Sequence, residues 1–287
     1  MPDLEVRIAR FLEQPLAVIK DPAQPLSSPV YPGARLRRVR DLDRDRLAPA
    51  IHTALRVAKA VVRALRDPVE PRAIPSDGLI WRTQIEASGP VDLDDVLADL
   101  WSRGVPVVPL DLLPAPSFQG LACIVGGRPV ILLGHRHDEP GRVAFIVAHE
   151  AGHIAGDHCE EGSPVVDEDE AIEDESPMER DADQFAIRTL VGNDDVPAID
   201  AGDFRQLAKT AVAVERASGA DASACIFAWA RKTGDYGMAT MAVHALYRAK
   251  GASRSLRRHL DQHVDLEGAT ESDRNLLRLV RGDPAPG

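Results

Sequence analysis

Residues 143–158 read VAFIVAHEAGHIAGDH, and this stretch decides how the middle of the chain folds. A helix at the protein surface has one polar face and one apolar stripe. Here the apolar residues would point to every side of a helix: Val143, Ala144, Phe145, Ile146, Val147, Ala148, Ile154 and Ala155. The stretch therefore predicts a buried helix. Burial of His149, Glu150 and His153 inside it is unfavourable unless each of these side chains has a partner.

The spacing of the two histidines predicts that this partner is a metal ion. His149 and His153 are four residues apart, so on a helix they share one face with Cβ atoms about 5–6 Å apart. Both imidazoles can then bind one ion, and Glu150 lies beside the pair without being a ligand. This is the H-E-x-x-H arrangement of zinc peptidases. We expect a Zn²⁺ site with His149 and His153 as ligands and Glu150 as the catalytic base.

A catalytic zinc has three protein ligands and one open position, so a third ligand is required. Glu179 comes 26 residues after His153, near the start of a second predicted helix at 177–192, and Asp183 follows it on the same face. We expect Glu179 to bind the metal and Asp183 to accept the distal N–H of a ligating histidine. The alternatives for the third ligand are Asp157, His158, Cys159, Glu160 and the acidic residues of 167–175.

His158 is an auxiliary candidate. It lies five residues past His153 and beyond Gly156, so it is rotated away from the predicted ligand face. A structural role near the end of the helix is the favoured interpretation. A hydrogen bond to a transition-state oxyanion is the alternative.

The elements on either side of this helix predict an α+β fold with a small antiparallel or mixed sheet. A helix is expected at 92–104, capped by Asp92. The following VPVVPLD is typical of a short edge strand, because proline cannot donate to a ladder. The segment 120–134, GLACIVGGRPVILLG, predicts a hairpin that turns at Gly126 and Gly127.

The chain is expected to have three parts. Residues 1–90 form a proline-rich N-terminal extension with one main helix at about 45–66 and a connector at 67–90. Residues 91–192 form the metallopeptidase core. Residues 193–287 form a C-terminal region with a helical pattern.

Composition indicates a cytoplasmic protein. The sequence is 44% hydrophobic and 28% charged, as in soluble globular proteins. We expect no membrane span and no signal peptide, because no apolar run is long enough and the N-terminus lacks a basic region followed by an apolar one. The three cysteines include no CxxC pair and are expected to be free thiols.

Negative charge is concentrated around the predicted site. Residues 138–195 contain 18 Asp and Glu against three Arg, a local balance of −15 in a chain whose net charge is −11. Such a surface repels phosphate, so direct nucleic-acid binding is not expected here. It would attract a basic protein partner. A solvated acidic loop without further function is the simpler interpretation.

With these residues placed, the stretch from about 91 to 192 resembles the ImmA/IrrE family of metallopeptidases. The resemblance covers about a third of the chain. It lies in VPVVP, in GRPVILLG, in RVAFIVAHEAGHIAGDH and in MERDADQFAIRTLVG. The last segment reproduces the spacing E-x-x-A-x-x-F-A with Glu179, Ala182, Phe185 and Ala186.

The resemblance implies a zincin-like fold and a zinc-dependent endopeptidase of bacterial or phage origin. Family members typically cleave cytoplasmic helix-turn-helix repressors that control stress or mobile-element genes. This sequence departs from many relatives because it shows no helix-turn-helix and has an unusually acidic segment after the first ligand helix. The alternative is a non-catalytic zinc-containing binding or sensor module that sequesters a regulator, and the intact Glu150 favours catalysis.

Overall fold

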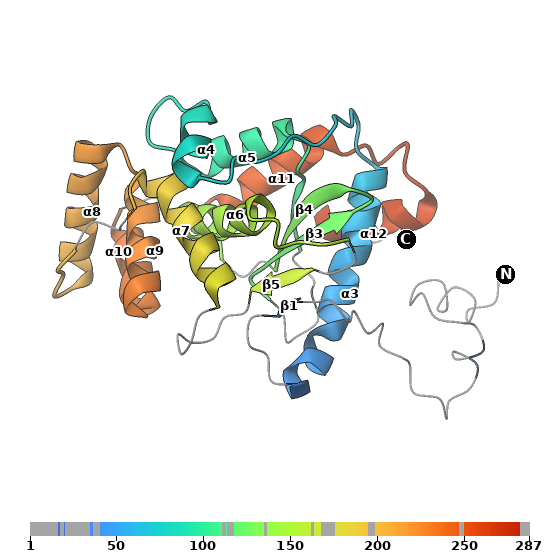
Figure 1. The fold of residues 1–287 in the computed structure, drawn as a ribbon, viewed down its shortest axis with the longest axis horizontal. Coiled ribbons are helices and arrows are strands. Elements are labelled where there is room, and N and C mark those ends of the chain that lie inside the picture. The colour runs from blue at the N-terminus through green and yellow to red at the C-terminus, as the bar shows by residue number, and fades with distance from the viewer. Residues whose placement is uncertain are drawn as a thin grey trace.

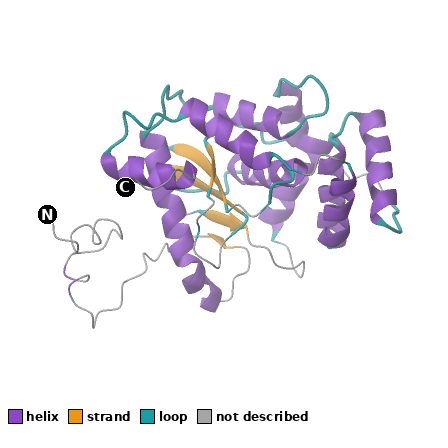
Figure 2. Ribbon diagram, turned by 180° about the vertical axis from the view of Figure 1, so that it is seen from behind, coloured by secondary structure: helices purple, strands orange, loops and turns teal. Residues whose placement is uncertain are grey.

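The computed structural model describes residues 17, 20, 35–36, 41–110, 113, 118–134, 137–161, 164–167, 176–194, 199–246 and 250–281. In these residues the chain folds into a small mixed sheet surrounded by helices (Figures 1 and 2). The predicted α+β class is therefore confirmed.

The sheet is built around the predicted hairpin. Its five described strands are β1 (Arg35–Leu36), β2 (Val107–Pro109), β3 (Gly120–Val125), β4 (Arg128–Leu133) and β5 (Val165–Asp167), in the order β1-β5-β3-β4-β2. β3 and β4 pair antiparallel, and Gly126 and Gly127 make the turn with φ of 58° and 75°. β2 pairs parallel with β4. It lies at one edge of the sheet, which is the position that the prolines predicted.

The strands β1 and β5 were not predicted from the sequence. β5 pairs antiparallel with β3, and β1 pairs parallel with β5 at the other edge of the sheet. The two strands have two and three residues. Segments this short carry no recognisable alternation, so only their pairing partners define them.

The described helices lie between residues 41 and 281. They are α3 (Asp41–Arg63), α4 (Gly78–Gln84), α5 (Leu93–Ser102), α6 (Pro140–Ala155), α7 (Pro177–Val191), α8 (Phe204–Ser218), α9 (Ala222–Thr233), α10 (Tyr236–Ala245), α11 (Ala252–His263) and α12 (Glu271–Arg281). Asp92 and Asp95 form a capping box at the start of α5. Gly192 ends α7 in the left-handed conformation with φ of 79°. The predicted positions of α5, α6 and α7 are confirmed.

The connector predicted at 67–90 was wrong in one part, because Gly78–Gln84 form helix α4. Asp77 caps it by accepting a hydrogen bond from the backbone of Leu79. Trp81 stacks on Phe185 of α7 at 5.4 Å between ring centroids, and Arg82 donates to the last carbonyls of α7. A helix of seven residues is too short to show a periodic pattern. Its stability comes from contacts with α7 more than from the helix propensity of its own residues.

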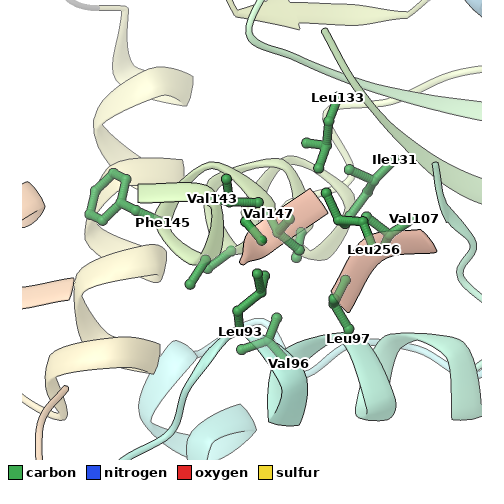
Figure 3. Close-up of a cluster of buried hydrophobic side chains, with 14 of the residues drawn as sticks. Leu93, Val96, Leu97, Val107, Ile131, Leu133, Val143, Phe145, Val147 and Leu256 are labelled. Atoms are coloured by element: carbon green, nitrogen blue, oxygen red, sulfur yellow. The ribbon is translucent and has the colours of Figure 1, made fainter. Parts of the chain in front are cut away.

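The core is continuous from α3 to α12. Successive residues of a strand point to opposite faces, and Leu121 and Ala122 of β3 are both fully buried, so both faces of the sheet are covered. Helices α3 and α6 both pack against β3 and β4. Figure 3 shows Leu93 and Leu97 of α5 in one cluster with residues of α6, β4 and α11.

The first and last parts of the chain are also joined. Arg63 at the end of α3 forms an ion pair with Asp273 of α12 at 2.6 Å. The three parts therefore share one hydrophobic core in the described residues, and the proposed division at residues 90 and 192 stays a prediction.

None of the described helices combines the length and the apolar character that crossing a membrane requires. Within the described residues, Cys123, Cys159 and Cys225 form no disulfide; Cys123 and Cys225 are buried and Cys159 is partly exposed.

Candidate metal centre

Helices α6 and α7 cross at small residues, and this crossing builds the site. A Cβ added to Gly152 would lie 3.0 Å from the Cα of Ala182, tighter than ordinary van der Waals contact. Glycine and alanine at these positions let the two backbones approach closely. The approach brings Glu179, in the first turn of α7, against the face of α6 that carries His149 and His153.

The three predicted ligands converge on one point. The Nε2 atoms of His149 and His153 are 3.1 Å apart. The Glu179 carboxylate places Oε2 at 3.3 Å from His149 Nε2 and Oε1 at 3.5 Å from His153 Nε2. All three residues are at most 3% exposed. In the described residues this is the group of side chains that can hold a metal ion.

Asp183 contacts both His149 and Arg231. Its Oδ1 lies 2.7 Å from His149 Nδ1, and its Oδ2 lies 2.7 Å from Nε of Arg231 in α9. Burial alone would raise the pKa of Asp183, but the hydrogen bond with His149 and the charges of His149 and Arg231 lower it to about 2. Asp183 is therefore a carboxylate that only accepts, so Nδ1 of His149 is the donor in this hydrogen bond, and Nε2 is the ring nitrogen that faces the candidate metal position.

His153 is held as a neutral imidazole. Burial, followed by the neighbouring His149, lowers the pKa of His153 to about 3. His158 is the partner of its other ring nitrogen, with 3.0 Å between the two Nδ1 atoms. His158, the auxiliary candidate, therefore contacts a candidate ligand, and its role stays a prediction. Neutral histidines are the form that binds metals.

Glu150 follows His149 in α6 and is fully buried. Strand β3 lies close to its side chain. A Cβ added to Gly120 would overlap the Oε1 of Glu150, so only glycine leaves room for this carboxylate. Gly120 is the first residue of β3 and pairs with Asp167 and Leu133 on its two sides. The first residue of β3 therefore leaves the space that the predicted base occupies.

The alternative third ligands do not join the cluster in the described residues. Asp157 and Glu160 are exposed beyond the end of α6, and Cys159 is partly exposed. Residues 168–175, the rest of the acidic segment, lie outside the described residues.

Sequence reasoning missed two residues of the site, Arg231 and Gly120. Arg231 follows Asp183 by 48 residues in a region whose pattern indicated only helices. Gly120 appeared only as the start of the hairpin. Neither position carries a local signal, because its importance comes from a contact between distant segments.

No family model matches the sequence, and no curated protein matches it.

Replacing Asp183 with alanine is expected to weaken metal affinity by about 10–100-fold while the protein stays folded, because His149 loses the acceptor that fixes its ring. A competition between the protein and a chelator, with zinc as the probe ion, measures this. An affinity equal to that of wild type would show that Asp183 does not orient His149.

Replacing Gly120 with alanine is expected to leave the metal bound and to reduce hydrolysis by about 100-fold, because displacement of a catalytic group by about 1 Å has an effect of this size. The measurement compares metal content with peptide hydrolysis. Gly89→Ala is the matched control, since a Cβ there meets nothing within 4 Å. Full activity in Gly120→Ala would mean that the Glu150 carboxylate does not need this position.

Proposed function

We propose that this protein is a zinc-dependent endopeptidase with a zincin-like core. The observation that carries the proposal is the buried group of His149, His153 and Glu179 with Glu150 on the same helix. A binding module has no use for a buried carboxylate beside its metal ligands, whereas a hydrolase needs a base there.

The separations within the group support zinc. Ligand atoms at about 2.0–2.2 Å from a tetrahedral zinc ion are roughly 3.3–3.6 Å apart. The two Nε2 atoms are 3.1 Å apart, and Oε2 and Oε1 of Glu179 lie 3.3 Å from His149 Nε2 and 3.5 Å from His153 Nε2, which is close to this range. Two histidines and one carboxylate are also a usual ligand set of catalytic zinc, in which the fourth position stays open.

Each residue then has a defined task. His149, His153 and Glu179 would hold the zinc ion, which would supply Lewis acidity and lower the pKa of a water molecule. Glu150 accepts the proton of the attacking water and delivers a proton to the leaving amine. Asp183 and Arg231 keep the ring of His149 in place, and the missing side chain at Gly120 leaves room for the carboxylate of Glu150.

The proposed substrate is a cytoplasmic DNA-binding repressor of the helix-turn-helix type, in stress or mobile-element regulation. Two arguments support this. The ImmA/IrrE resemblance implies such substrates, and the −15 balance of residues 138–195 would speed the encounter with a basic protein.

The test compares the proteomes of cells that produce wild-type protein with those that produce Glu150→Gln. A DNA-binding regulator should be shortened only in the wild-type cells and should be captured intact by the variant. If no protein is shortened in cells that produce zinc-loaded wild type, the peptidase proposal is wrong and the sequestering module takes its place.

A further inference from the structure

The C-terminal end of α6 turns the chain back toward a candidate metal ligand. The backbone N–H of His158 donates to the carbonyl of His153 at 2.9 Å, and that of Asp157 donates to the carbonyl of Ile154 at 3.2 Å. These two hydrogen bonds are the pair that defines a Schellman motif. The motif brings the residue after the left-handed position close to the third residue from the helix end. Here these two residues are His158 and His153.

Asp157 occupies the left-handed position of this motif, with φ of 54°. Among the described residues it is the one non-glycine residue with positive φ, whereas α7, α8 and α9 end with glycine in this conformation. Glycine enters this region without a steric cost, and aspartate does so at a cost that is smaller than for most other residues. A costly backbone conformation that persists beside a candidate site points to a function for the residue it positions.

The imidazole of His158 contacts His153 through the ring nitrogen that does not face the candidate metal position. Nε2 of His153 faces Nε2 of His149, and Nδ1 of His153 lies 3.0 Å from Nδ1 of His158. Gly156 leaves space for the His158 ring, because a Cβ there would lie 2.8 Å from its Nε2. Each candidate histidine ligand therefore has a hydrogen-bond partner at Nδ1: Asp183 for His149 and His158 for His153.

The chain is also held after His158. The backbone N–H groups of Gly126 and Gly127, at the turn between β3 and β4, donate to the carboxylate of Glu161 at 3.0 and 3.1 Å. Glu161 forms a backbone bridge with Ile124 of β3 as well. The helix cap before His158 and the hairpin contact after it thus fix the segment that carries this imidazole.

We propose that His158 is a positioning residue for His153, and that the cap built on Asp157 holds it in place. The inference rests on the metal site of the proposed function and not on peptide hydrolysis. When Nε2 of His153 binds a metal, its Nδ1 carries the proton and donates to Nδ1 of His158. The contact would fix the ring plane of the second histidine ligand, as is expected of Asp183 for the first.

The zinc affinity of two variants at residue 158, measured by competition with a chelator, tests the proposal. His158→Phe keeps a ring and removes the acceptor, so it should weaken zinc binding by about 10–100-fold. His158→Asn loses the ring but can place its side-chain oxygen near the position of Nδ1, so it should bind zinc more tightly than His158→Phe. His244→Phe is the matched control, because His244 is an exposed histidine in the last turn of α10 and lies outside the candidate site.

Two variants at residue 157 test the cap without changing any imidazole. Asp157→Gly should keep the zinc affinity of wild type, because glycine adopts positive φ freely. Asp157→Val should lower it, because a β-branched residue fits poorly at positive φ and the cap that holds His158 is disturbed. The Tm of each metal-free variant, measured on the same samples, separates a local change from loss of the fold.

A purely structural role for His158 predicts the opposite order at residue 158, because phenylalanine replaces the volume of the ring better than asparagine does. Tighter zinc binding by His158→Phe than by His158→Asn would therefore overturn the proposal. So would an affinity of His158→Phe equal to that of wild type, which is what the oxyanion alternative predicts.

These binding measurements contain no peptide, so they separate failure of this inference from failure of the proposed function. A zinc-loaded wild type that hydrolyses no peptide, together with weakened zinc binding in His158→Phe, rejects the peptidase and supports the positioning role. An active peptidase whose zinc affinity does not change in His158→Phe rejects the positioning role alone.

Discussion

Glu150→Gln is expected to keep the metal and to reduce peptide hydrolysis by a factor of about 10²–10⁴, the range for removal of a general base. Glutamine has nearly the shape of glutamate, so the close approach of Gly120 to this side chain is preserved. The amide cannot accept a proton as the carboxylate does. Folding and metal binding should therefore be unaffected while the chemical step is lost.

The measurement is the hydrolysis of a random peptide mixture by purified zinc-loaded protein, with metal content determined on the same samples. The same variants compared in cells can exclude an enzymatic role. If Glu150→Gln equals wild type in every cellular readout while variants of His149 and His153 do not, the metal is structural and the protein is a binding module.

The sequence predicted those parts of the site that lie on single helices. A spacing of four residues was enough to place His149 and His153 on one face, and their Nε2 atoms are indeed 3.1 Å apart. The same reasoning placed Glu179 and Asp183 on one face of α7, where both now point at His149. Helical periodicity is a local property, so one sequence is sufficient to infer it.

Contacts between helices could not be predicted from the sequence in the same way. The close crossing of α6 and α7 depends on Gly152 and Ala182, and nothing in either segment alone indicates that these two residues meet. Arg231 reaches Asp183 only because α9 packs against α6 and α7. The C-terminal region, whose role the sequence left open, thus supplies a contact to the candidate metal centre.

In the fold, too, elements determined by local residues were predicted, and an element determined by contacts with a distant segment was not. The hairpin, the edge strand β2 and the capped helix α5 follow from turn glycines, prolines and Asp92, all of which act locally. Helix α4 exists because Trp81 and Arg82 contact α7. Its seven residues are too few to be recognised without those contacts.

The second large effect is expected at the third ligand, Glu179. Wild-type protein should bind close to one zinc per chain, and Glu179→Ala should lose it, because two histidines alone do not complete a catalytic site. Zinc at 100 to 1,000 times its Kd stabilises a folded protein by about 2.7–4.1 kcal/mol. A rise in Tm on zinc addition is therefore expected for wild type and not for Glu179→Ala.

Glu271→Ala is the matched control for this experiment. Glu179 and Glu271 are both acidic residues in the first turn of a helix, and Glu271 is exposed on α12. The control measures the loss of a favourable charge at a helix N-terminus, which amounts to about 0.3–1 kcal/mol. The loss of zinc and of the zinc-induced rise in Tm in Glu179→Ala, neither of which Glu271→Ala should show, then belong to the ligand role. Full zinc retention in Glu179→Ala would instead assign the third ligand to the acidic residues of 167–175, and the metal would be held by a loop rather than by the crossing of α6 and α7.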